Sequence, residues 1–124
     1  INLTFLRNHL MKILFLCTAN IQRSRTAEDH FRENYPEHSY KSAGLSEKYC
    51  KQHRTTVCTT ELLDWADKVF AMETMHLQRI EDYAGKHYLD KVENLTIADV
   101  YQYMHPDLVK TLDTHEKLQF LKPN

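Results

Sequence analysis

KILFLCTANIQRS, the stretch from residue 12 to residue 24, joins an apolar run to a cysteine, Cys17, and ends on Arg23 and Ser24. The apolar run has the composition of a strand buried on both faces. The residues that follow Ser24 have the periodicity of a helix. The stretch therefore predicts a strand, a turn with the spacing Cys-x5-Arg-Ser, and a helix.

A turn of this length can curl until its backbone N–H groups point inward and form a concave anion site. The helix behind it adds unpaired N–H groups and the positive end of its dipole. Arg23 can hold two phosphoryl oxygens with its guanidinium fork, and the positive field favours a Cys17 thiolate, which is a nucleophile. Ser24 either caps the helix or donates its hydroxyl to the Cys17 sulfur. The predicted phosphate-binding loop comprises Thr18, Ala19, Asn20, Ile21, Gln22 and Ser24, and Asn20 tolerates left-handed backbone.

Strand and helix patterns alternate along the chain. Strands are expected at 13–16, 39–43, 69–72 and 91–95, and residues 45–58 are expected to form a polar loop. Pro36 closes the first helix, Thr59 or Thr60 caps a short second one, and Thr74 caps a third that ends at Gly85. Pro106 opens the last helix. This order predicts an α/β fold, a small doubly wound four-stranded parallel sheet with helices on both faces.

Composition narrows the classes of function. A length of 124 residues suits one domain, which we place at residues 11–124 behind an N-terminal extension of residues 1–10. The formal net charge of -1 argues against nucleic-acid or membrane partners. Only two glycines are present, which excludes glycine-rich nucleotide-binding loops. The sequence contains no apolar run long enough for a membrane span or a signal peptide, so a cytoplasmic location is expected.

The cysteine count is three, an odd number that argues against a disulfide framework. Cys50, His53 and Cys58 have spacings that zinc ligands can show, but a closed zinc site needs a fourth ligand. We therefore expect no metal and no cofactor.

Several motifs resemble the low-molecular-weight protein tyrosine phosphatase family, in its short, mostly bacterial branch. The loop and the Thr-Ala-Glu that follows it, at 17–28, resemble the family signature. Three further segments, at 42–44, 65–73 and 97–101, resemble its second strand, its third strand with the following turn, and its general-acid loop. The resemblance extends from about Met11 to Leu121 and implies a phosphomonoesterase that uses a phosphocysteine intermediate.

The resemblance also implies roles for residues outside the loop. Asp99 would be the general acid, with Asp90 and Asp107 as rivals, and Ser42 would hold the loop asparagine. Tyr101 and Tyr103 are candidates for an aromatic wall beside the substrate ring, although half-buried tyrosines are common. The expected substrate is a phosphotyrosine protein or a small aryl phosphate, and inorganic phosphate is the product.

Alternative functions stay open at this point. A non-catalytic phosphate or phosphotyrosine binder is suggested by Ala19, Arg25 and Val100, which depart from the family pattern. An arsenate reductase would need two further cysteines beyond the third strand, and 69–83 contains none. A phosphoarginine phosphatase is a further relative, but that branch has threonine where this chain has Ile21, which favours aryl phosphates.

Overall fold

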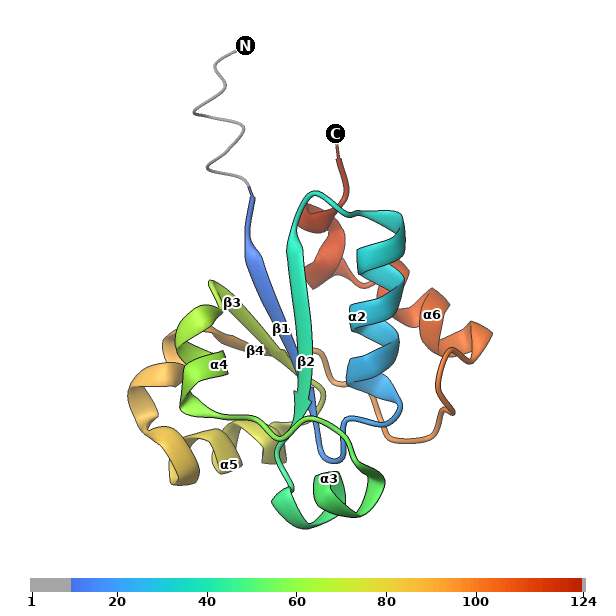
Figure 1. The fold of residues 1–124 in the computed structure, drawn as a ribbon. Helices are drawn as coiled ribbons and strands as arrows, with labels where there is room; N and C mark the ends of the chain where they lie inside the picture. Colours follow the sequence, from blue (N-terminus) through green and yellow to red (C-terminus); the bar gives the residue numbers. More distant parts are fainter. Residues whose placement is uncertain (1–9, 124) are drawn as a thin grey trace.

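A computed structural model of the protein describes residues 10–123, so the extension predicted at residues 1–10 lies almost wholly outside the described residues. Within them the chain forms a four-stranded parallel sheet with the strand order β2-β1-β3-β4 (Figure 1). The strands are β1 (Lys12–Cys17), β2 (Ser39–Gly44), β3 (Lys68–Ala71) and β4 (Val92–Asn94). The α/β fold with a four-stranded parallel sheet is confirmed.

The apolar residues of β1 explain its place inside the sheet. Ile13 and Phe15 belong to the buried cluster on one face, and Leu14 and Leu16 belong to the cluster on the other. All four side chains are fully buried. Since successive side chains of a strand point to opposite faces, a continuous apolar run satisfies two cores at once.

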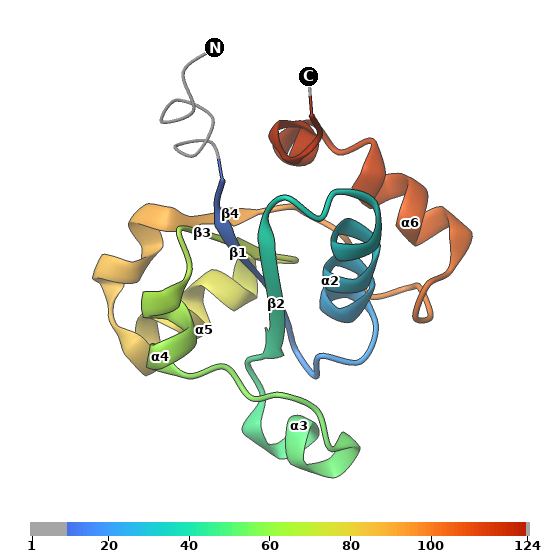
Figure 2. The ribbon, with the colours of Figure 1, turned by 45° about the horizontal axis from the view of Figure 1, so that its top comes forward.

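Helices cover both faces of the sheet, as the two views show (Figures 1 and 2). On one face lie α2 (Arg23–Asn34), α6 (Pro106–Asp113) and the 3-10 helix η2 (Glu116–Leu121). On the other lie α4 (Thr60–Trp65), α5 (Thr74–Ala84) and the 3-10 helix η1 (Lys86–Lys91). No helix in the range 10–123 is long and apolar enough to cross a membrane.

Most predicted helix boundaries are confirmed. Thr59 caps α4 and accepts from the Leu62 N–H, Gly85 ends α5, and Pro106 is the first residue of α6. The prediction that Thr74 caps α5 is wrong by one residue, because the N-cap is Glu73. There the His76 ring accepts a hydrogen bond from the Glu73 N–H.

The prediction of a loop over 45–58 is also wrong in part, because α3 spans Glu47–His53. The Ser46 hydroxyl caps this helix, and Cys50 is its only buried side chain among the seven residues. A two-turn helix with one buried residue has no apolar stripe, so the periodicity of the sequence cannot reveal it. In Figure 2, α3 lies beyond the end of β2.

The carboxyl end of β1 lies where the direction of winding reverses. The chain passes from β1 to β2 on one side, and β3 then pairs with the other side of β1. Crevices at such points are where open α/β sheets bind ligands. The residues that join β1 to α2 lie there.

Candidate active site

The loop from Cys17 to Arg23 is held by the backbone that directly follows β2. The carbonyls of Cys17 and Thr18 accept hydrogen bonds of 2.9 Å from the N–H groups of Leu45 and Ser46. Asn20 has a φ of 56°, the left-handed conformation that asparagine tolerates. These contacts turn the chain sharply between β1 and α2.

Ser24 does not cap α2, whose N-cap is Gln22. Its hydroxyl oxygen lies 3.0 Å from the Cys17 sulfur and 2.8 Å from Nδ2 of Asn20. An amide nitrogen can only donate, so the Ser24 oxygen accepts from Asn20. The Ser24 hydroxyl proton is then free to be donated to the sulfur. The sequence left two roles open for Ser24, a helix cap or a donor to the Cys17 sulfur, and the structure shows the contact with the sulfur.

Asn20 also fixes the loop to the second strand. Its Nδ2 donates to the Ser42 hydroxyl at 2.9 Å, which is the contact that the resemblance implies. The Ser42 hydroxyl in turn donates to the carboxylate of Glu28 on α2. In this series of hydrogen bonds the donor and the acceptor of each contact are therefore defined, and the last contact is with the Cys17 sulfur, the candidate nucleophile.

The Arg23 side chain is only 2% exposed, although it carries a charge. Its Nη1 donates at 2.7 Å to Oε2 of Glu73 and at 2.7 Å to the carbonyl of Ile97. Its Nε lies 3.7 Å from Oδ1 of Asp99. Because both short contacts use Nη1, they leave Nη2 for a ligand.

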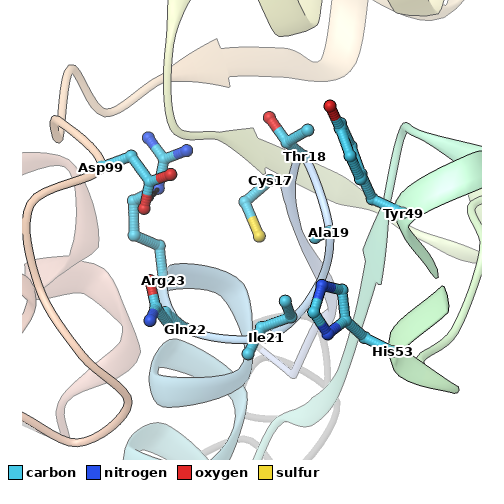
Figure 3. Close-up of a pocket in the computed structure, with 9 residues that line it drawn as sticks. All are labelled: Cys17, Thr18, Ala19, Ile21, Gln22, Arg23, Tyr49, His53 and Asp99. Carbon is cyan, nitrogen blue, oxygen red and sulfur yellow. Dashed lines mark ion pairs between the residues drawn. The ribbon is translucent and has the colours of Figure 1, made fainter.

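A pocket of about 220 Å³ opens above the loop, with Cys17, Arg23 and Asp99 in its lining (Figure 3). Arg23 and Asp99 lie on one side of the Cys17 sulfur, and Tyr49 and His53 lie on the other. The Asp99 side chain is 59% exposed, so it faces both the pocket and solvent. The lining consists of Cys17, Thr18, Ala19, Ile21, Gln22, Arg23, Tyr49, His53 and Asp99.

The rival acidic residues lie elsewhere. Asp107 is in the first turn of α6, and Asp90 is in η1. Neither is among the described residues that line the pocket.

The structure does not bring the two predicted wall tyrosines to the described lining of the pocket. Tyr101 packs on the core and on the ring of His105, with ring centroids 5.9 Å apart. Tyr103 donates its hydroxyl to Asp29. The aromatic side chain at the pocket is Tyr49, which was missed because its segment has the composition of a loop.

Two further residues were missed, both at the start of α5. Glu73 pairs with Arg23, and His76 is fully buried with its Nε2 3.0 Å from the hydroxyl of Thr18. Burial, followed by the positive charge of Arg23, lowers the pKa of His76 to about 4. Their separation of three residues, one helical turn, is the signal that could have paired them.

The remaining cysteines are free thiols in the described structure. Burial raises the pKa of Cys58 to about 12 and also raises the pKa of Cys50. Among residues 10–123 no three His, Cys, Asp or Glu side chains gather as a metal site requires. The thiol of Cys50 lies 3.9 Å from the Thr18 carbonyl, so this cysteine packs beneath the loop.

Comparison with known proteins finds a family model that matches the part of the chain containing the loop. Residues 12–61 match the family described as low molecular weight phosphotyrosine protein phosphatase. No curated protein matches the chain significantly in sequence.

Solved structures extend the similarity to most of the chain. A YwlE mutant from Bacillus subtilis is 27% identical with a TM-score of 0.64, over 90% of this chain and 95% of that one. The tyrosine phosphatase Wzb from Escherichia coli K30, in complex with phosphate, is 25% identical with a TM-score of 0.68, over 91% of this chain and 98% of that one. The YwlE arginine phosphatase from Geobacillus stearothermophilus is 24% identical with a TM-score of 0.63, over 88% of this chain and 93% of that one, and it has the same fold.

Fold and loop together define a cysteine-based phosphatase, a hydrolase of the protein-tyrosine-phosphatase type. The chain is similar to the low molecular weight phosphotyrosine protein phosphatase family, in sequence over residues 12–61 and in fold over most of its length. Members of this family act on phosphorylated substrates and bind phosphate.

Proposed function

We propose that this protein hydrolyses aryl phosphate monoesters, phosphotyrosine in proteins above all, through a phosphocysteine intermediate on Cys17. The observation that carries the proposal is the Ser24 hydroxyl 3.0 Å from the Cys17 sulfur, in one pocket with Arg23 and Asp99. A hydroxyl proton directed at sulfur stabilises a thiolate, the form that attacks phosphorus.

The reaction proceeds in two steps. The Cys17 sulfur forms a bond to phosphorus while the bond to the aryl oxygen breaks, and Asp99 gives that oxygen its proton. Water, deprotonated by Asp99, then attacks phosphorus and breaks the sulfur–phosphorus bond, which releases inorganic phosphate. Arg23 and the loop N–H groups hold the equatorial oxygens throughout.

The choice of an aryl substrate rests on the pocket lining. Ile21 is an apolar residue of the phosphate loop, and Tyr49 presents an aromatic ring at the same pocket. Both suit the ring of phosphotyrosine, because apolar and aromatic surfaces pack on one another. Arginine phosphatase activity, described for the Geobacillus relative, is the second candidate, and the apolar Ile21 argues against it. The free state of all three cysteines agrees with a cytoplasmic location, which we propose as well.

A turnover assay tests the proposal. We expect hydrolysis of p-nitrophenyl phosphate and of a phosphotyrosine peptide, and slower hydrolysis of phosphoarginine. Cys17→Ser should abolish turnover and retain binding of inorganic phosphate. If the wild-type protein binds phosphate without turnover, the protein is a phosphate binder instead. If phosphoarginine is the better substrate, the assignment to aryl phosphates is wrong.

The control variant for the substrate class is Ile21→Thr. It keeps the β-branched shape and adds a hydroxyl to the pocket lining. We expect it to shift the ratio of the two kcat/KM values toward phosphoarginine. An unchanged ratio would show that the substrate is selected elsewhere.

A further inference from the structure

His76 lies in the first turn of α5 and is fully buried behind the phosphate loop. Its two ring nitrogens contact different partners. The Glu73 N–H donates to Nδ1 at 3.0 Å, and Nε2 lies 3.0 Å from the hydroxyl oxygen of Thr18. The imidazole therefore bridges the helix cap and the residue that follows Cys17.

The partners decide the tautomer of this ring. A backbone N–H can only donate, so Nδ1 carries a lone pair. Burial and then the charge of Arg23 disfavour a second proton, Glu73 opposes these two effects more weakly, and the effects of Arg79 (against the proton) and Asp99 (for it) are smaller still. The ring is neutral, its proton resides on Nε2, and Nε2 donates to Thr18.

The first turn of α5 thus contacts both ends of the phosphate loop. Glu73 holds Nη1 of Arg23 at 2.7 Å, and His76 holds Thr18, the residue next to Cys17. The oxygen of Thr18 accepts from His76, which leaves the hydroxyl proton of Thr18 for another acceptor in the pocket that it lines. The start of α5 therefore positions both Thr18, at the beginning of the loop, and the Arg23 side chain, at its end.

We propose that His76 is a positioning residue of the phosphatase site, which through Thr18 holds the start of the loop in the geometry that the Cys17 attack requires. The proposal rests on the proposed function. It concerns a residue that touches neither substrate nor sulfur, and its effect should appear in kcat more than in KM.

Thr18 provides the sharpest test. Thr18→Val keeps the shape and removes the acceptor, whereas Thr18→Ser keeps the hydroxyl. We expect kcat for p-nitrophenyl phosphate to fall about 3- to 10-fold in Thr18→Val, with little change in KM, and to fall less in Thr18→Ser. Equal kcat values for the wild type and Thr18→Val would overturn the proposal.

Two His76 variants separate positioning from folding. His76→Asn keeps an acceptor near the place of Nδ1 but is too short to reach Thr18. His76→Gln can place an amide donor near Nε2 but leaves the Glu73 N–H without its acceptor. We expect kcat to fall in His76→Asn and the melting temperature to fall in His76→Gln. A parallel fall of both quantities in both variants would show that His76 is only structural.

A double-mutant cycle measures the coupling directly. Once Thr18→Val has removed the hydroxyl, His76→Asn should lower kcat no further. Additive losses would contradict the contact between the two residues as the route of the effect.

A readout without turnover keeps this inference separate from the proposed function. The rate at which iodoacetate alkylates Cys17 should fall more in Thr18→Val than in Thr18→Ser. If the wild-type protein hydrolyses none of the substrates, the proposed function is wrong, but the alkylation rate still reports whether His76 and Thr18 affect the geometry of the loop at Cys17. Unchanged alkylation in every variant would refute the positioning role.

Discussion

Cys17 and Gly44 are register partners at the last position where β1 and β2 pair. A β-carbon added to Gly44 would lie 2.7 Å from the Thr18 carbonyl oxygen and 2.4 Å from the Cys50 sulfur. The close approach of this strand to the phosphate loop is therefore possible only without a side chain at residue 44.

Gly44→Ala is expected to destabilise the fold by about 1–3 kcal/mol, the cost of overpacking, and to lower kcat/KM because the loop backbone must shift. Urea unfolding and a turnover assay measure the two effects. Gly85→Ala is the matched control. The φ of 120° at Gly85 means that this substitution should also destabilise the fold, but Gly85 lies at the end of α5 and not beside the loop. A stability loss without an activity loss in Gly44→Ala would contradict this role.

Ser24→Ala should slow the alkylation of Cys17 by about 10- to 100-fold at neutral pH, because a hydrogen bond to the thiolate is lost. Ser39→Ala, at the exposed start of β2, is the control. Cys58 should stay unlabelled, since burial raises its pKa to about 12. Unchanged alkylation in Ser24→Ala would show that the sulfur is stabilised by other groups.

Arg23→Lys should lower kcat by about 10²–10³-fold, because a lysine keeps the charge and loses the two-pronged contact with the phosphoryl oxygens. It also cannot span Glu73 and Ile97 with one nitrogen while presenting another to the ligand. Steady-state kinetics on p-nitrophenyl phosphate measure the loss. The neighbouring Arg25 is exposed, and Arg25→Lys should stay near wild type. Near-wild-type kinetics of Arg23→Lys would place the anion elsewhere.

Asp99→Asn should lower kcat by about 10²–10⁴-fold for a substrate with a poor leaving group and much less for an activated aryl phosphate. The poor leaving group needs the proton, whereas the activated one departs without it. Asp107→Asn and Asp90→Asn are the controls, and a larger loss in either would show that the acid is misassigned.

The stability of the protein should depend on pH through His76. Its pKa is lowered to about 4 from 6.5, so between these values the unfolded chain binds the proton and the folded one does not. Stability is full above about pH 6.5 and falls as the pH drops toward 4, by an amount of the order of 3 kcal/mol. The difference in unfolding free energy between the wild type and His76→Asn isolates this effect. A difference that does not vary between pH 7 and pH 4.5 would contradict it.

Local patterns in the sequence determine the fold and one half of the site. The apolar run before Cys17 is long enough to be buried on both faces, and it predicts a central parallel strand. The spacing from Cys17 to Arg23 lies within a single turn, so the loop could be predicted from adjacent residues. Gly85 and Pro106 also act locally, because their backbone restrictions end or start a helix wherever they stand.

The other half of the site was determined only by the tertiary structure. Glu73 and His76 reach the loop only because β3 pairs beside β1 and brings the start of α5 to the carboxyl end of the sheet. Tyr49 enters the pocket on a helix whose single buried residue, Cys50, leaves no apolar period in the sequence. Contacts between residues about 30 to 60 positions apart depend on sheet order and packing, and no local pattern records these. The sequence by itself therefore determined the loop from Cys17 to Arg23. The packing of α3 and α5 against this loop determined which other side chains line the pocket and contact the loop.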